Sequence, residues 1–291
     1  MSGPTLAGAG AILLWAFLAV LTRGAANVPP FGLMAGCFAI SGAGGIGWLA
    51  LRGRLAEVRQ PPLAWLHGVG GLFGYHALYF AALRLAPAAQ ANLLNYCWPL
   101  LIVVLSAVLL GLPLRAGHWA GLALGVAGCG LLLSGAAEFT PADGLGYALA
   151  LGSALVWALY SVASRWFLSV PTGALAGFCV ATAVLAAVCH LVFETPTPIQ
   201  TVAEGALLLL LGAGPLGGAF YLWDIGMKRG DPRLLGTLAY ATPVLSTVLL
   251  IAAGFAPFTL ATVAAAALVG AGGLIAARSA SPTVLPDQAG S

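Results

Sequence analysis

Apolar residues fill most of this chain in stretches of about twenty, separated by short breaks that often contain proline. A helix needs roughly 20 residues to cross about 30 Å of hydrocarbon, because it rises about 1.5 Å per residue. The alternation of polar and apolar residues that is typical of membrane strands is absent from the sequence. The pattern predicts ten membrane-spanning helices, at residues 5–24, 31–51, 63–84, 88–111, 117–135, 144–166, 173–193, 204–227, 233–254 and 258–277.

The composition agrees with this pattern. Hydrophobic residues make up 61% of the chain and charged residues only 7%, with a mean hydropathy of +1.01, whereas soluble proteins carry about a quarter charged residues. A water-soluble fold could not bury so much apolar surface, so we expect an all-α integral membrane protein. No soluble domain remains between the helices. Residues 279–291 are polar and contain proline, and we expect them to form a disordered cytoplasmic tail.

The chain contains two copies of one pattern. A shift of 144 positions places Pro99 over Pro243 within a long ungapped match, and a shift of 142 places Trp15 over Trp157. A repeat of this length indicates duplicated structural units, each with five of the predicted helices. The two copies are expected at residues 1–138 and 139–278.

The basic residues predict the orientation. If the N-terminus is cytoplasmic, nine of the eleven Lys and Arg residues lie inside and only Arg23 and Arg84 lie outside, as the positive-inside rule requires. We therefore expect both termini in the cytoplasm. Because each copy has an odd number of spans, the second copy is expected to be inverted relative to the first. Inverted repeats are typical of secondary transporters, which bind substrate near the midplane and work by alternating access.

In each copy a glycine-rich helix and a short basic hinge precede a helix with the pattern A-x-x-x-x-L-x-x-x-x-P-x-x. The pattern runs from Ala89 to Leu100 in the first copy and, less cleanly, from Leu234 to Val244 in the second. In these features, nearly the whole chain resembles the EamA branch of the drug/metabolite transporter superfamily. Its aromatic residues resemble those of the bacterial aromatic amino-acid exporters. The resemblance implies export of amino acids, aromatic and a broad range of others, across the bacterial inner membrane.

Several aromatic and polar residues lie near the middle of their predicted spans. A phenol or an indole N–H at that depth needs a polar partner or water. Aromatic and polar residues that share one helix face predict a solvated cavity, whereas hydrogen bonding between helices is the structural alternative. The expected substrate-binding residues are Trp15, Tyr75, His76, Tyr79, Asn95, Tyr96, Trp98, Trp157, Tyr160, Tyr221 and Tyr240.

Ionisable residues inside a membrane are functional candidates because burying them is costly. His76 could bind a substrate carboxylate or change protonation during transport, or it could be a satisfied core histidine. Asp224 is a second candidate for proton coupling, although an ion pair with Lys228, four residues on, is the favoured interpretation. Pro99 and Pro243 are expected to kink their helices, each freeing the carbonyl four residues earlier.

No Lys or Arg lies within a predicted membrane core, which disfavours phosphorylated substrates and favours a zwitterion or a neutral solute. Organic cations would also suit an aromatic cavity through cation–π contacts, so a multidrug exporter is the nearest alternative. A passive channel-like facilitator is an alternative of another class.

An enzyme is disfavoured, because the sequence contains neither H-E-x-x-H nor C-x-x-C and its four histidines are scattered. We expect no cofactor, metal site or nucleic-acid partner. The protein is expected to work as a monomer in the lipid bilayer.

Overall fold

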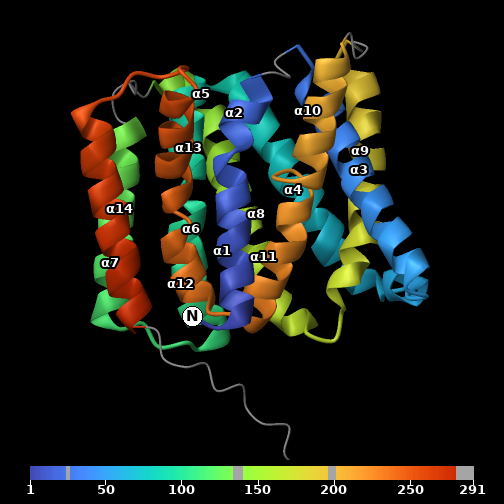
Figure 1. Cartoon of the computed structure of the whole chain (residues 1–291), viewed down its shortest axis with the longest axis horizontal. Coiled ribbons are helices and arrows are strands. Elements are labelled where there is room, and N and C mark those ends of the chain that lie inside the picture. The colour runs from blue at the N-terminus through green and yellow to red at the C-terminus, as the bar shows by residue number, and fades with distance from the viewer. Residues whose placement is uncertain (24–26, 134–139, 196–200, 280–291) are drawn as a thin grey trace, which may run out of the picture.

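The computed structural model of the protein describes residues 1–23, 27–133, 140–195 and 201–279. Its helices run side by side in one bundle (Figure 1). The expected tail lies outside the described residues except for Ser279. The α-helices are α1 (Gly3–Ala16), α2 (Leu18–Arg23), α3 (Pro30–Leu51), α4 (Pro62–Leu85), α5 (Ala88–Asn95), α6 (Trp98–Leu110), α7 (Ala116–Leu133), α8 (Gly144–Ala163), α9 (Leu175–Phe193), α10 (Val202–Ala213), α11 (Gly218–Arg229), α12 (Pro232–Leu238), α13 (Ala241–Ala252) and α14 (Leu260–Ser279).

The expected all-helical membrane class is confirmed. Within the described residues, eight helical segments are long and apolar enough to cross a membrane. The other two predicted spans are also helical. Helix α4 has 24 residues but is less apolar, because it carries two histidines, two tyrosines and an arginine, and α7 is described over 18 residues.

Both predicted proline kinks lie next to helix breaks. Helix α5 ends at Asn95 and α6 begins at Trp98, so Pro99 stands in the first turn of the second half-helix. Because proline has no N–H, it leaves the Asn95 carbonyl without its usual helical partner. The expectation of a second free carbonyl, at Ala239, is wrong: the Thr242 N–H bonds to it at 3.0 Å, which tightens the turn between α12 and α13.

A third break, between α10 and α11, was not expected. Residues 214–217 separate these helices, and the Leu211 carbonyl accepts a hydrogen bond from the Leu216 N–H at 2.8 Å instead of continuing the helix. Pro215 lies four residues after Leu211, where its ring and its missing N–H are incompatible with a continuous helix. Gly214 caps the end of α10.

Equivalent helices of the two copies pack antiparallel. In α3 and α9, the backbone near Gly32 lies against His190 and that near Gly42 against Val180. In α7 and α14, Gly121 lies against Gly272, and Figure 1 shows these two helices as a pair at one edge of the bundle.

Other helices also pack across the boundary between the two copies. Helix α4 of the first copy packs on α8 of the second, and α11 of the second copy packs on α1 of the first. This arrangement is the one that an inverted repeat requires.

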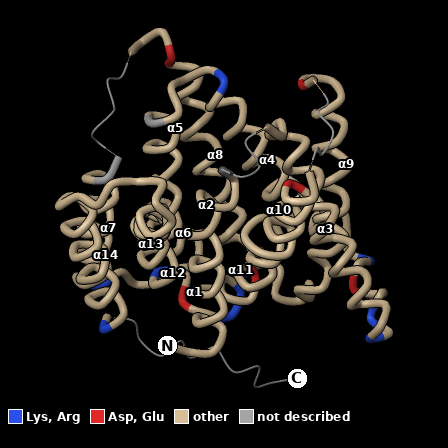
Figure 2. The backbone as a smooth tube through the Cα atoms, turned by 45° about the horizontal axis from the view of Figure 1, so that its top comes forward, with Lys and Arg blue, Asp and Glu red and all other residues tan. Residues whose placement is uncertain are grey.

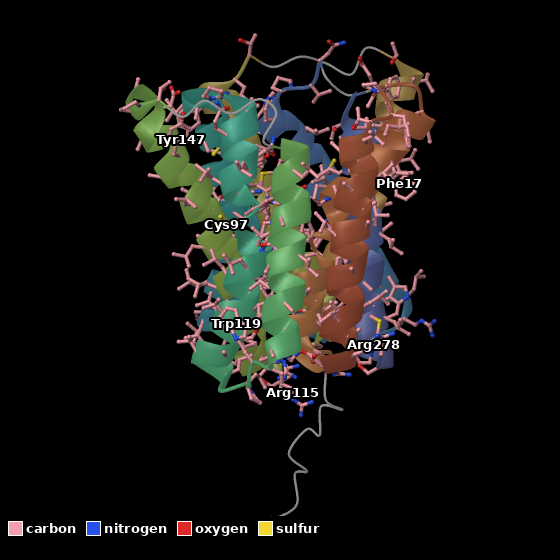
Figure 3. All side chains as sticks on the ribbon, turned by 90° about the vertical axis from the view of Figure 1, so that its left-hand side faces the viewer. Phe17, Cys97, Arg115, Trp119, Tyr147 and Arg278 are labelled. Atoms are coloured by element: carbon pink, nitrogen blue, oxygen red, sulfur yellow. The ribbon has the colours of Figure 1, made fainter. Side chains whose placement is uncertain are left out.

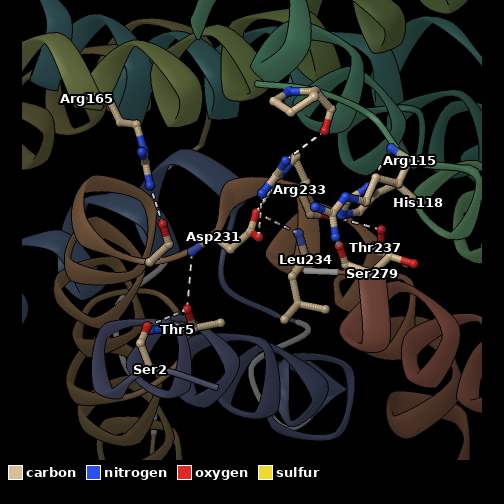
Figure 4. Close-up of polar contacts among 12 residues, drawn as sticks. Ser2, Thr5, Arg115, His118, Arg165, Asp231, Arg233, Leu234, Thr237 and Ser279 are labelled. Atoms are coloured by element: carbon tan, nitrogen blue, oxygen red, sulfur yellow. Dashed lines mark hydrogen bonds and ion pairs between the residues drawn. The ribbon is translucent and has the colours of Figure 1, made fainter. Parts of the chain in front are cut away.

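Most of the Lys and Arg residues lie toward the end of the bundle that holds the N-terminus (Figure 2). A buried ion pair lies at this end: Arg233 donates from Nε and Nη2 to the two carboxylate oxygens of Asp231, both at 3.0 Å. Its Nη1 also donates to the Pro113 carbonyl at 2.7 Å. The Asp231 N–H donates to Thr5 Oγ1 at 3.2 Å, which ties the start of α1 to the pair (Figure 4).

Arg165, which follows α8, extends this network. Its Nε donates to the Met227 carbonyl at 3.1 Å, and its Nη2 donates to the Gly230 carbonyl. Buried charges of this kind need a complete set of partners, because an unpaired charge in a low-dielectric interior is strongly destabilising. The network therefore joins α1, α8, the α11–α12 turn and the segment before α7 at one end of the molecule.

Candidate functional site

An aromatic cluster lies where the two copies meet, and Trp157 of α8 is at its centre. The Trp157 ring lies 5.8 Å from Trp15 of α1, 5.3 Å from Tyr75 of α4 and 6.5 Å from Trp98 of α6, measured between ring centroids. It also lies 6.3 Å from Trp223 of α11. These distances are typical of favourable aromatic pairs. Side chains from both copies therefore form one continuous aromatic surface, which we call the aromatic cluster.

The cluster is held in place by hydrogen bonds to its indole groups. The Trp15 Nε1–H donates at 3.0 Å to the Pro215 carbonyl, a group exposed by the break between α10 and α11. The Trp223 Nε1–H donates at 3.0 Å to Ser161 Oγ. Among the hydrogen bonds of the described residues, none uses the indole N–H of Trp98 or Trp157. Two donors of the cluster thus remain for a ligand.

A polar group borders the cluster on the side of α5. Asn95 accepts from Ser153 Oγ at 2.9 Å through Oδ1 and donates to the Tyr75 hydroxyl at 3.2 Å through Nδ2. The side chain of Asn95 is therefore fixed by both copies, since Ser153 belongs to α8. Its free backbone carbonyl lies at the same break, so an acceptor and a fixed amide stand together beside the rings.

His76 is buried in the cluster but already has a partner. Its Nδ1 lies 2.7 Å from the Leu72 carbonyl of the same helix. Its ring meets Phe38 at 5.4 Å and Phe220 at 6.0 Å, both in edge-on arrangements. The Nδ1–H donates to Leu72 and fixes the ring, so in the neutral ring Nε2 is an acceptor: it can take a hydrogen bond from a ligand donor, but it cannot donate to a substrate carboxylate.

The structure does not bring all the predicted residues together. Tyr79 stacks 6.1 Å from Tyr75 and donates to Asn92, and Tyr160 lies 5.2 Å from Trp157, so both border the aromatic cluster. Tyr96 and Tyr240 instead belong to a second apolar cluster with residues of α7 and α14.

Tyr221 faces away from the aromatic cluster. Its hydroxyl donates to the Ser41 carbonyl of α3 at 3.3 Å, and its side chain lines a groove between α3 and α11. It therefore lies on a different face of α11 from Trp223.

Three members of the cluster were missed by the sequence analysis: Phe38, Phe220 and Trp223. Trp223 is 1% exposed and lies 5.0 Å from Trp15. The repeat contained a signal for two of them, because the shift of 144 places His76 over Phe220 and Tyr79 over Trp223. In the sequence analysis, we considered aromatic residues that carry a hydroxyl or N–H group, so phenylalanine was left out.

Asp224 is paired as the sequence analysis favoured. Its Oδ1 lies 2.9 Å from Lys228 Nζ, and its Oδ2 accepts from Thr172 Oγ1 at 2.6 Å. Lys228 also donates to the Val170 carbonyl at 2.9 Å. Within the described residues, no group of His, Cys, Asp and Glu side chains is arranged to hold a metal ion.

The aromatic cluster suits a flat, amphipathic ligand. Its rings can stack on an aromatic or aliphatic group, and the indole donors, the Asn95 carbonyl and the Tyr75 hydroxyl can bind polar groups. Apolar walls with a few fixed polar groups are the usual construction of small-molecule sites.

Comparisons with known proteins agree over nearly the whole chain. A sequence profile of the EamA-like transporter family matches residues 3–134 and again residues 144–278. The aromatic amino acid exporter YddG of Ancylobacter novellus is 52% identical over 279 residues, 94% of this chain and 97% of its own. A protein of the same name from Salmonella typhimurium is 27% identical over 264 residues, 84% of this chain and 86% of its own. A solved crystal structure with 52% identity matches with a TM-score of 0.91, covering 96% of this chain and 98% of that chain.

Proposed function

Because the chain belongs to the EamA-like transporter family, we propose that it exports aromatic amino acids, together with a broad range of other amino acids, across the bacterial inner membrane. The expectation of a transporter rather than an enzyme is confirmed by that membership and by the 52% identical relative, which is named as an aromatic amino acid exporter. The observation that carries the substrate assignment is the aromatic cluster between the two copies.

The cluster fits the parts of an amino acid. An aromatic side chain stacks against Trp157 and Trp98, whose rings meet at 90° and so offer two walls. The ammonium group is bound by the free Asn95 carbonyl and the Tyr75 hydroxyl, and the carboxylate by the indole N–H groups. Because the walls are apolar and carry few fixed polar groups, they also accept aliphatic side chains.

Transport proceeds by alternating access between the inverted copies, with both termini in the cytoplasm. The buried network around Asp231 and Arg233 holds the cytoplasmic end together, and it separates when that end opens. At the other end, Arg84 occupies the position equivalent to Lys228. Its Nη2 lies 3.4 Å from Glu194 Oε1, a longer contact than the Asp231–Arg233 pair makes, and 49% of the Arg84 side chain is exposed. The Glu194 carboxylate is itself only 2% exposed and also accepts from the Phe31 and Gly32 N–H groups, so it ties the end of α9 to the start of α3.

The proposal has two versions, which differ in the energy source for transport. Proton exchange would use His76 or the Asp224–Lys228 pair, the ionisable groups nearest the transport path. Facilitated diffusion needs neither. The paired state of Asp224 and the bonded state of His76 leave downhill export as the simpler version.

The proposal is tested by counterflow of labelled phenylalanine into proteoliposomes that contain the purified protein. Unlabelled tyrosine, threonine and methionine are offered as competitors, with tetraphenylphosphonium as the organic cation. We expect phenylalanine uptake, competition by all three amino acids and little competition by the cation. An imposed pH gradient changes the rate only if protons are exchanged. Cation uptake without phenylalanine uptake would establish a drug exporter instead.

A further inference from the structure

A groove of about 750 Å³ lies between α3 and α11, on the face of α11 turned away from the aromatic cluster. Ser41, Gly44 and Gly45 of α3 line one wall, and Tyr221 and Ile225 of α11 line the other. Phe220 and Trp223 point from α11 into the aromatic cluster on its other side. The groove is therefore separated from the proposed substrate site by the width of this helix.

The groove has the length of one leaflet of a bilayer. It begins near Ser41, in the middle of α3, and passes Trp48 and Leu49 close to the end of that helix at Leu51. Ten residues of helix correspond to about 15 Å, which is half of the roughly 30 Å hydrocarbon core. A ligand lying in it would reach from the midplane to the headgroup region.

Its walls leave room for a hydrocarbon chain. Gly44 is exposed and has no atom of another helix within 4 Å of the position where a Cβ would stand. Glycine in α3 and the break between α10 and α11 therefore open a slot that a longer side chain would fill. Most of the slot is lined by carbon atoms, which suits an acyl chain rather than a polar solute.

The mouth of the groove is basic. Arg54 and Arg229 both line it, and the Arg54 guanidinium lies over the Trp48 ring at 5.3 Å from its centroid. Glu57 pairs with Arg54, whereas Arg229 is exposed and forms no ion pair within the described residues. The mouth thus carries a net positive charge at the depth where tryptophan usually marks the headgroup level.

We propose that this groove is a binding site for an anionic phospholipid. The acyl chain lies along Gly44 toward the midplane, and the phosphate group is bound by Arg54 and Arg229. Basic pockets between membrane helices bind anionic headgroups in this way. A bound lipid would fill the gap between α3 and α11, one helix from each copy, and stabilise the present conformation.

The test compares lipid binding by the delipidated protein, measured by native mass spectrometry with phosphatidylglycerol or phosphatidylcholine. We expect the wild type to bind phosphatidylglycerol roughly tenfold more tightly, because two arginines face the phosphate. Gly44→Phe should fill the slot and remove this binding. Gly47→Phe is the matched control: it lies on the same helix, is equally unobstructed and does not line the groove.

The charge of the mouth is tested separately. The double substitution Arg54→Gln and Arg229→Gln should reduce the preference for phosphatidylglycerol to less than twofold, while some binding of both lipids remains. Equal binding of the two lipids by the wild type would overturn the proposal, as would full phosphatidylglycerol binding by Gly44→Phe. If Gly44→Phe blocked amino-acid transport without changing lipid binding, the groove would be a substrate path and the lipid assignment would be wrong.

Discussion

Replacing Trp157 by alanine is expected to lower phenylalanine transport more than tenfold. The change removes the central ring of the aromatic cluster, which contacts Trp15, Tyr75 and Trp98. An aromatic contact contributes about 0.5–1.5 kcal/mol beyond its buried area, and about 1.4 kcal/mol corresponds to a factor of ten. The substrate loses its stacking contact with Trp157 and also the apolar area that it buries against this ring, so the total effect exceeds tenfold. The initial rate in proteoliposomes, divided by the amount of inserted protein, measures the effect.

Two variants separate a transport defect from a folding defect. Trp157→Phe keeps an aromatic wall and should recover part of the rate. Trp119→Ala removes a tryptophan of α7 that is 51% exposed and lies at the outer surface of the bundle (Figure 3), so its rate should match the wild type. If Trp157→Ala inserted normally and transported phenylalanine at the wild-type rate, the cluster would not be the substrate site.

Replacing Arg233 by alanine is expected to destabilise the protein by about 3–5 kcal/mol, because it leaves the buried Asp231 carboxylate without its cation. The Asp231 and Arg233 side chains are only 6% and 7% exposed, so water cannot substitute for the lost partner. Arg233→Lys should lie between alanine and the wild type, since an ammonium group cannot reproduce the two parallel hydrogen bonds. The thermal midpoint of the detergent-solubilised protein, followed by size-exclusion chromatography after heating, gives this order.

Two further variants test whether the unpaired Asp231 carboxylate causes the loss of stability in Arg233→Ala. Arg278→Ala removes an exposed arginine near the same end of the molecule (Figure 3) and should leave the midpoint unchanged. The double substitution Asp231→Asn and Arg233→Met removes both charges and should be more stable than Arg233→Ala alone. A midpoint of Arg233→Ala equal to that of the wild type would contradict a stabilising role for the pair.

The limits of the helices were predictable because hydrophobic length is a strong signal in a membrane. The break at residues 214–217 was not predictable from the repeat, because Gly70 and Gly214 occupy equivalent positions in the two copies. The decisive difference lies one residue later, where Gly71 of the first copy is replaced by Pro215. Helix α4 therefore continues, whereas its counterpart divides into α10 and α11.

The candidate site was predictable in part. Helical spacing shows which residues share a face of one helix, but it does not show which neighbour that face meets. Tyr96 and Trp98 are two residues apart, and residues at that spacing point in different directions. Their separation into two clusters follows from this geometry. Trp98 turns to the other copy at the centre, and Tyr96 turns to α7 and α14.

The most direct test of the central claim is release of phenylalanine from living cells. A bacterial strain that lacks its own aromatic amino-acid exporters is fed a phenylalanine-containing dipeptide, and the phenylalanine that appears in the medium is measured over time. We predict several-fold faster release with the wild-type protein than with an equal amount of the Trp157→Ala variant. Equal release by the wild type, the variant and cells without either protein would contradict the claim that this protein exports aromatic amino acids.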